Sequence, residues 1–114
     1  MTGKVGSILF CCTLNAVRSP MAEGLAKRLF GTRVYVDSAG VKRDAVDPFV
    51  VAALDEIGVD IRRHKAKTIE EMHDSSFDVI VTLSPEARHK ALELTRIMAC
   101  EVEYWPTFDP ALIQ

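Results

Sequence analysis

A cysteine and an arginine with five residues between them stand near the start of the chain, in the segment CTLNAVRS at 12–19. A loop of this length ahead of a helix can aim several backbone N–H groups, and the positive end of the helix dipole, at one anion. The same groups, with the guanidinium of Arg18, would favour the nucleophilic thiolate of Cys12. Arg18 carries a planar fork that can clamp two oxygens of one anion. The spacing predicts a phosphate-sized cradle with a nucleophile at its floor, and Ser19 is expected to donate to the thiolate.

Cleavage of a phosphate ester also needs an acid that protonates the departing oxygen. Asp109, in WPTFDP, is the candidate, because it follows the last expected strand and so belongs at the carboxyl edge of a parallel sheet, beside the Cys12 loop. Asp47 also precedes a proline, but it has an equally good role as a helix N-cap and ranks below Asp109. Asp-Pro pairs also open turns, and that interpretation of Asp109 stays open.

Strands and helices alternate along the chain around these residues. Short apolar runs predict buried strands at 5–11, 33–37 and 77–83, and an alternating pattern predicts an edge strand at 100–105. The expected helices cover 19–30, 47–57, 84–98 and, as a short helix, 68–74. Three of them open on a capping residue followed by proline, at Ser19, Asp47 and Ser84. This order predicts an α/β sandwich around a four-stranded, mainly parallel sheet, with its ligand at the carboxyl ends of the strands.

Composition limits the class of protein and its partners. A chain of 114 residues, 48% hydrophobic and 26% charged, fits one domain, and its net charge of −2 with scattered basic residues argues against a nucleic-acid partner. Since no segment approaches the roughly 20 apolar residues of a membrane span and the N-terminus lacks a signal-peptide pattern, we expect a cytoplasmic protein with no membrane partner. Three cysteines, two of them adjacent, make a poor disulfide framework, and no spacing resembles a zinc site. We therefore expect reduced thiols, no metal and no cofactor.

The segment CTLNAVRSP at 12–20 resembles the signature loop C-x-x-N-x-x-R-S of the low-molecular-weight protein tyrosine phosphatase family. Matching segments follow in the family's order, with DSAG at 37–40, HKA at 64–66 and the Asp-Pro at 109–110. The resemblance thus covers nearly the whole chain. It implies a three-layer sandwich with a four-stranded parallel sheet in the order 2-1-3-4.

The same resemblance implies a role for each residue of the loop. Cys12 would form a phosphocysteine, Arg18 would clamp the phosphate and Asp109 would be the acid, with no metal. Asn15 would hold the shape of the loop and Ser19 would donate to the thiolate. The other phosphate-binding positions of the loop are Thr13, Leu14, Ala16 and Val17. The implied activity is hydrolysis of a phosphorylated protein, in particular a phosphotyrosine protein, or of a small phosphomonoester.

Four residues, at three places in the chain, depart from the family pattern. Leu14 stands where family phosphatases usually have a glycine, which a tight loop can need for a positive φ. Val17 stands where many members have a second cysteine, and Ala111-Leu112 replaces tyrosines that often line a phosphotyrosine pocket. The βα pattern also calls for one more helix after 110, so the domain at 1–114 is expected to lack a C-terminal helix. The sequence makes no prediction of the oligomeric state.

Three alternative functions remain open on these residues. An arsenate reductase that uses an external thiol shares the loop and the fold, but the segment TLSPEARHKA at 82–91 has no cysteine. Cys100 is expected at the opposite end of the sheet from Cys12, too far away for a disulfide. A protein arginine phosphatase is compatible with Thr13. An anion-binding module without turnover is the third alternative.

Overall fold

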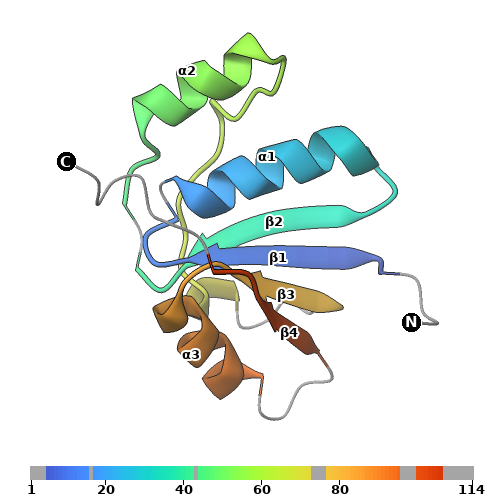
Figure 1. Ribbon diagram of the computed structural model, residues 1–114, viewed down its shortest axis with the longest axis vertical. Coiled ribbons are helices and arrows are strands. Elements are labelled where there is room, and N and C mark those ends of the chain that lie inside the picture. Colours follow the sequence, from blue (N-terminus) through green and yellow to red (C-terminus); the bar gives the residue numbers. More distant parts are fainter. Residues whose placement is uncertain (1–4, 16, 43, 73–76, 96–99, 107–114) are drawn as a thin grey trace.

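The computed structural model describes residues 5–15, 17–42, 44–72, 77–95 and 100–106. In chain order the elements are β1 (Ser7–Cys12), α1 (Arg18–Phe30), β2 (Tyr35–Gly40), α2 (Pro48–Glu56), the 3-10 turn η1 (Glu70–Met72), β3 (Val79–Thr82), α3 (Pro85–Leu94) and β4 (Glu101–Tyr104). The strands pair in parallel in the order β2-β1-β3-β4 (Figure 1). The expected sandwich and strand order are confirmed.

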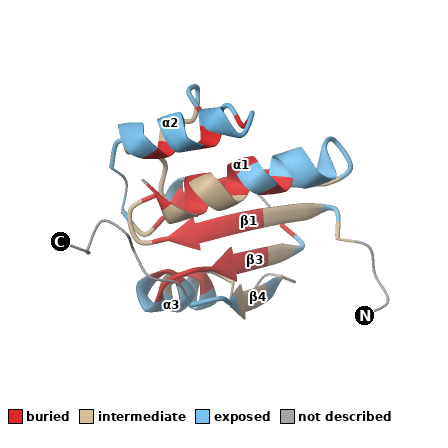
Figure 2. Ribbon diagram, turned by 45° about the horizontal axis from the view of Figure 1, so that its top comes forward, coloured by how far each residue is buried: buried red, intermediate tan, exposed pale blue. Residues whose placement is uncertain are grey.

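The two adjacent cysteines lie on opposite faces of the sheet, because side chains alternate along a strand. Cys11 packs with Leu9 and with alanines of α3 on one face, whereas Cys12 packs with Phe10 and Ala26 of α1 on the other. Figure 1 shows α1 and α3 on opposite sides of the sheet, with α2 stacked outside α1. Burial concentrates in the carboxyl halves of β1 and β3 (Figure 2), which lead into the Cys12 loop and the start of α3.

Two helices begin as the sequence predicts. The Asp47 carboxylate accepts from the amide of Phe49 at 2.8 Å, and the Ser84 hydroxyl accepts from the amide of Ala87 at 3.2 Å. Each capping residue is followed by proline at the first helical position, where the missing N–H is not needed. Asp47 is therefore the N-cap of α2, which is the structural role that placed it below Asp109 as a candidate for the catalytic acid.

The prediction that Ser19 caps the first helix is wrong. Helix α1 begins at Arg18, and its N-cap is Val17, which makes no side-chain capping bond. The Ser19 hydroxyl lies instead 2.9 Å from Cys12 Sγ. A buried hydroxyl can satisfy only a few partners at once, and here it serves the loop rather than the helix end.

Two other boundaries differ from the predicted ones. β2 continues to Gly40, because the Ser-Ala-Gly segment at 38–40, which reads as a loop, pairs with residues 10–12 of β1. α3 ends at Leu94 and is capped by Thr95, whereas the predicted end near 98 lies outside the described residues. A short helix is predicted at 68–74. In the part of that range that the structure describes, residues 68–72, the structure has only the three-residue 3-10 turn η1.

Candidate active site

The loop after β1 turns its carbonyl groups outward. The carbonyls of residues 12, 13 and 14 accept from the amides of Val41, Lys42 and Asp44 at 3.0, 2.8 and 3.0 Å. A trans peptide holds each carbonyl opposite the N–H that follows it, so the amides of residues 13–15 point to the other side, into the loop. The Asn15 amide accordingly donates to Cys12 Sγ at 3.1 Å. The backbone thus forms a cradle of N–H groups around a buried thiol.

Asn15, not Leu14, has the left-handed backbone of this loop. Its φ is 55°, and no other described residue except glycine has a positive φ. Asparagine adopts this region more readily than most side chains do. Leu14 instead packs against the apolar cluster of Val17 and the residues beneath α2. The loop therefore accommodates Leu14, and no glycine is needed at that position.

The side chain of Asn15 is fully buried and engaged at both ends. Its Nδ2 donates to the Ser19 and Ser38 hydroxyls at 2.7 and 3.0 Å. Its Oδ1 accepts from the Lys67 amide at 3.0 Å and lies 3.1 Å from His64 Nε2. One amide group therefore joins the loop to α1, to β2 and to the segment before η1.

Ser19 connects this network to the thiol. Its Oγ lies 2.9 Å from Cys12 Sγ and 3.4 Å from the carbonyl of Ala39. Because Oγ already accepts from the Asn15 amide group, its own hydrogen is available for the sulfur or for that carbonyl. The geometry gives Ser19 a proton to donate to a thiolate on Cys12.

Arg18 and Thr13 connect the loop to the start of α3. Arg18 Nη1 donates to the carbonyl of Leu83 at 3.0 Å, just beyond β3. Thr13 Oγ1 donates to the hydroxyl of Ser84 at 3.1 Å. The guanidinium therefore lies at the carboxyl edge of the sheet, the edge where Cys12 ends β1.

Glu23 and His64 form a buried pair that the sequence analysis missed. Glu23 Oε1 accepts from the Ser38 hydroxyl at 2.5 Å and lies 3.3 Å from His64 Nδ1, while Oε2 pairs with Lys27 at 2.5 Å. Burial alone would raise the pKa of Glu23, but the hydrogen bonds from His64, Lys27 and Ser38 outweigh it and lower that pKa to about 2. The only sequence signal was a carboxylate four residues after Ser19, on the same face of α1.

The other two cysteines lie in different surroundings. Burial, with a smaller contribution from Cys12, raises the pKa of the Cys11 thiol far above its usual range. Burial also raises the pKa of Cys100, and Asp78 adds to this effect. The register aligns Cys100 with Ser7, five residues before Cys12 and so roughly 16 Å away along the strand. A disulfide needs Cβ atoms within about 4.5 Å, so Cys100 cannot reach Cys12 in this fold.

Two predicted site residues, Ala16 and Asp109, lie outside the described residues. Among the residues with described positions, no group of three or more His, Cys, Asp or Glu side chains could hold a metal ion. In the same ranges no helix is long and apolar enough to cross a bilayer.

A cysteine in a cradle of loop amides, followed by an arginine at the carboxyl edge of a parallel sheet, defines a class of α/β proteins that bind oxyanions beside a thiol. The family model of low molecular weight phosphotyrosine protein phosphatases matches residues 7–113. The chain belongs to this family.

Similar proteins of known name include both phosphatases and arsenate reductases. Arsenate reductase 1 of Staphylococcus epidermidis is 35% identical over 105 residues, which are 92% of this chain and 78% of that protein. A solved arsenate reductase in the phosphate-binding state is similar with a TM-score of 0.74 and 29% identity, over 93% of this chain and 79% of that chain. The tyrosine phosphatase AmsI of Erwinia amylovora has a TM-score of 0.83 over 100% of this chain and 82% of its own, and at 22% identity it shows the fold alone. Membership in this enzyme family therefore does not choose between the two reactions.

Proposed function

We propose that the protein is a cysteine-dependent phosphomonoester hydrolase that works through an S-phosphocysteine on Cys12. One observation carries the proposal: Cys12 Sγ accepts from the Asn15 amide at 3.1 Å and lies 2.9 Å from Ser19 Oγ, in a loop whose carbonyls at residues 12, 13 and 14 point outward. Such a site stabilises negative charge both on the sulfur and on an oxyanion above it. The substrate class is a phosphorylated protein side chain, with phosphotyrosine first, or a small phosphomonoester.

In the first step the Cys12 thiolate attacks phosphorus and the bond from phosphorus to the ester oxygen breaks. The loop amides and Arg18 stabilise the charge that spreads over the three remaining oxygens. Asp109, which follows β4 in the sequence, donates a proton to the departing oxygen. The products of this step are the alcohol and the S-phosphocysteine.

In the second step water attacks phosphorus and the bond between sulfur and phosphorus breaks. The Asp109 carboxylate now takes the proton from the water, and the Cys12 thiolate is the leaving group. The hydrogen that Ser19 Oγ can donate over 2.9 Å stabilises this thiolate as it forms. Inorganic phosphate is released and the enzyme returns to its starting state.

Hydrolysis of p-nitrophenyl phosphate by wild type and Cys12→Ser tests the mechanism. Removal of the nucleophile should lower kcat by about a thousandfold or more. Cys11→Ala is the matched control, because Cys11 faces the other side of the sheet, and it should keep kcat within about twofold. Undiminished turnover in Cys12→Ser would overturn the mechanism. Phosphate binding with no turnover in wild type would indicate a binding module instead.

Comparison of substrates then defines the specificity. Asp109→Asn should slow hydrolysis of alkyl phosphates more than that of aryl phosphates, because poor leaving groups need the proton most. A phosphotyrosine peptide and a phosphoarginine peptide of the same sequence separate the tyrosine phosphatase from the arginine phosphatase. We expect the phosphotyrosine peptide to have the larger kcat/KM.

Arsenate reduction is the second candidate, and the 35% identity to a named arsenate reductase favours it. Cys12 would displace water from arsenate, an external thiol would attack the Cys12 sulfur, and the electron pair of the sulfur–arsenic bond would leave with arsenite. A second thiol would then reduce the mixed disulfide. The external thiol is required, because the chain has no cysteine at 82–91 and Cys100 lies at the far end of the sheet.

Arsenate-dependent NADPH oxidation distinguishes the candidates, with thioredoxin or glutathione and the matching reductase as the thiol source. We expect no oxidation above the rate without arsenate. A rate that depends on arsenate and disappears in Cys12→Ser would replace hydrolysis by reduction as the function.

A further inference from the structure

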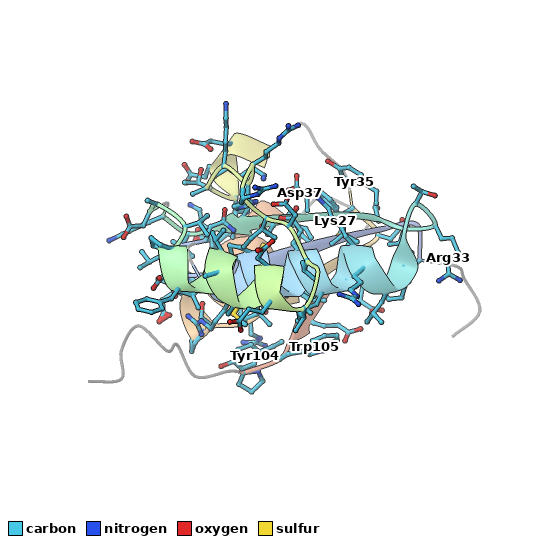
Figure 3. All side chains as sticks on the ribbon, turned by 90° about the horizontal axis from the view of Figure 1, so that it is seen from above. Lys27, Arg33, Tyr35, Asp37, Tyr104 and Trp105 are labelled. Atoms are coloured by element: carbon cyan, nitrogen blue, oxygen red, sulfur yellow. The ribbon has the colours of Figure 1, made fainter. Side chains whose placement is uncertain are left out.

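A cleft of about 560 Å³ lies beside α1, bounded by α1, β2 and the segment at 58–67. None of the described residues at 12–15 and 17–19 lines it, so it is separate from the Cys12 cradle. Its volume falls in the range of small-molecule sites, about 300–1,000 Å³. Figure 3 shows two of its residues, Lys27 and Asp37, with Arg33 far from them at the end of α1.

Basic side chains gather around this cleft although the protein as a whole is acidic. Of the 14 lysines and arginines in the chain, five line the cleft: Lys27, Arg28, Arg63, Lys65 and Lys67. Three carboxylates, those of Glu23, Asp37 and Asp60, lie among them. The net charge of the side chains that line the cleft is therefore positive, in a chain whose overall net charge is −2.

Each carboxylate of the cleft already has a basic partner. The pairs are Glu23 with Lys27 at 2.5 Å, Asp37 with Lys67 at 2.8 Å and Asp60 with Arg62 at 2.8 Å. Arg62 is not a lining residue, so Asp60 is neutralised from outside the cleft. The side chains of Arg28, Arg63 and Lys65 are exposed and make no hydrogen bond or ion pair within the described part of the chain. Arg63 adds a small attraction to Asp60, whose pKa it helps to lower, but Arg62 is the hydrogen-bonded partner of that carboxylate. Three cations are thus available to a ligand.

We propose that this cleft binds a small polyanion that carries two or more linked phosphate groups. Three cations around one cleft match several negative charges on one ligand, and two of them are arginines, whose forks suit phosphate oxygens. Among the residues that the structure describes, no Phe, Tyr or Trp lines the cleft. The phosphate chain itself is therefore recognised, rather than an attached base.

The cleft shares two residues with the network around Cys12. Glu23 and His64 line it, and they also contact Ser38 and Asn15. A polyanion in the cleft competes with Glu23 for the ammonium of Lys27. It would therefore weaken the ion pair of Glu23, the carboxylate that also contacts His64. The site goes beyond the proposed hydrolysis and does not depend on it.

Calorimetric titration of the full chain with sodium tripolyphosphate tests the site. Wild type and Arg33→Ser, a charge change at the far end of α1, should bind with dissociation constants within twofold of each other. The double variant Arg63→Ser/Lys65→Ser should bind about tenfold more weakly, since two exposed ion pairs to the ligand are lost and each contributes modestly. Arg28→Ser, on the other wall, is an independent second variant with about a threefold expected loss.

Arg18→Ala separates the cleft from the phosphate cradle. This variant should keep tripolyphosphate binding while it loses affinity for inorganic phosphate, and amide shifts in NMR spectra should appear at Lys27 and Gly58. Loss of all tripolyphosphate binding in Arg18→Ala, or unchanged binding in the double variant and Arg28→Ser, would overturn the proposal. None of these readouts uses turnover, so a failure of the proposed hydrolysis leaves their outcome unchanged.

Discussion

The amide of Asn15 donates to Cys12 Sγ over 3.1 Å from a backbone with a φ of 55°. The same residue buries its side chain among Ser19, Ser38 and His64. The conformation that aims the amide at the sulfur is thus held by contacts from three other parts of the chain. Asn15 therefore links the surroundings of the Cys12 thiol to the packing of the fold.

Replacement of Asn15 should separate the contribution of its side-chain hydrogen bonds from that of its left-handed backbone. Asn15→Ala removes the buried hydrogen bonds and also places alanine in the left-handed region, where its Cβ causes strain. Asn15→Gly removes the same hydrogen bonds without that strain, because glycine has no Cβ. We expect both variants to lose about 2–4 kcal/mol of unfolding free energy, with Asn15→Ala lower than Asn15→Gly by about 1 kcal/mol. Urea unfolding measures the difference. Equal stabilities would show that the positive φ carries no strain.

Gly40 should be essential because the loop packs directly on it. A Cβ at this position would lie 2.7 Å from the Asn15 amide nitrogen and 2.8 Å from the carbonyl carbon of Leu14, closer than atoms can pack. Gly40→Ala should therefore shift the loop, weaken phosphate binding about tenfold or more and lower stability by about 1–3 kcal/mol. Gly6→Ala, at the other end of β1, is the control and should bind phosphate as wild type does. Titration with inorganic phosphate and urea unfolding provide the two readouts, and unchanged affinity in Gly40→Ala would contradict the contact.

The fold and the core of the site could be predicted because their signals are local. Cys12, Asn15, Arg18 and Ser19 lie within eight consecutive residues, from the end of β1 to the first turn of α1. Alternation along β1 separates Cys11 from Cys12 without any tertiary information. The Ser-Ala-Gly segment at 38–40 misled the prediction, since it reads as a loop and becomes strand only by pairing with β1.

The buried pair of Glu23 and His64 could not be predicted, because its residues come from distant parts of the chain. Glu23, Ser38 and His64 come from α1, β2 and the segment before η1, and only the strand register and the path of that segment bring them together. A glutamate inside a helix usually faces water, and no local pattern distinguishes this one. This network is therefore formed only by contacts between distant segments.

The depressed pKa of Glu23 should make stability depend on acid pH. Its folded value of about 2 lies below the roughly 4.3 of an unfolded glutamate, so ionised Glu23 stabilises the fold above about pH 4.3, and that contribution is lost as pH falls toward about 2. The excess stability of wild type over Glu23→Gln, up to about 3 kcal/mol at pH 7, should shrink as pH falls from 5 to about 2. Urea unfolding at a series of pH values measures it. Glu56→Gln, an exposed change on α2, is the control, and its unfolding free energy should change with pH as that of wild type does. If the stability difference between wild type and Glu23→Gln did not change with pH, that result would argue against the charged pair.

Ser19 should matter mainly after the first chemical step. Its hydroxyl lies 2.9 Å from Cys12 Sγ, which is the leaving group of the second step in the proposed mechanism. Ser19→Ala should lower kcat about 10–100-fold, the effect of one hydrogen bond to a charged group, and KM should not rise. Because formation of the intermediate is affected less than its breakdown, a burst of nitrophenol should precede the steady state in stopped-flow measurements.

The burst distinguishes this role from a structural one. Loss of Ser19 also removes one of the two acceptors of the Asn15 side-chain amide, the other being Ser38. That loss alone would lower stability and slow both steps together. Ser7→Ala is the control, because that hydroxyl accepts from the Asp78 amide at the amino end of β1, far from the thiol, and its kcat should match wild type. A lowered kcat in Ser19→Ala without a burst would assign Ser19 to the scaffold of the loop. A burst of about one equivalent would make Ser19 the donor that stabilises the Cys12 thiolate as phosphate leaves.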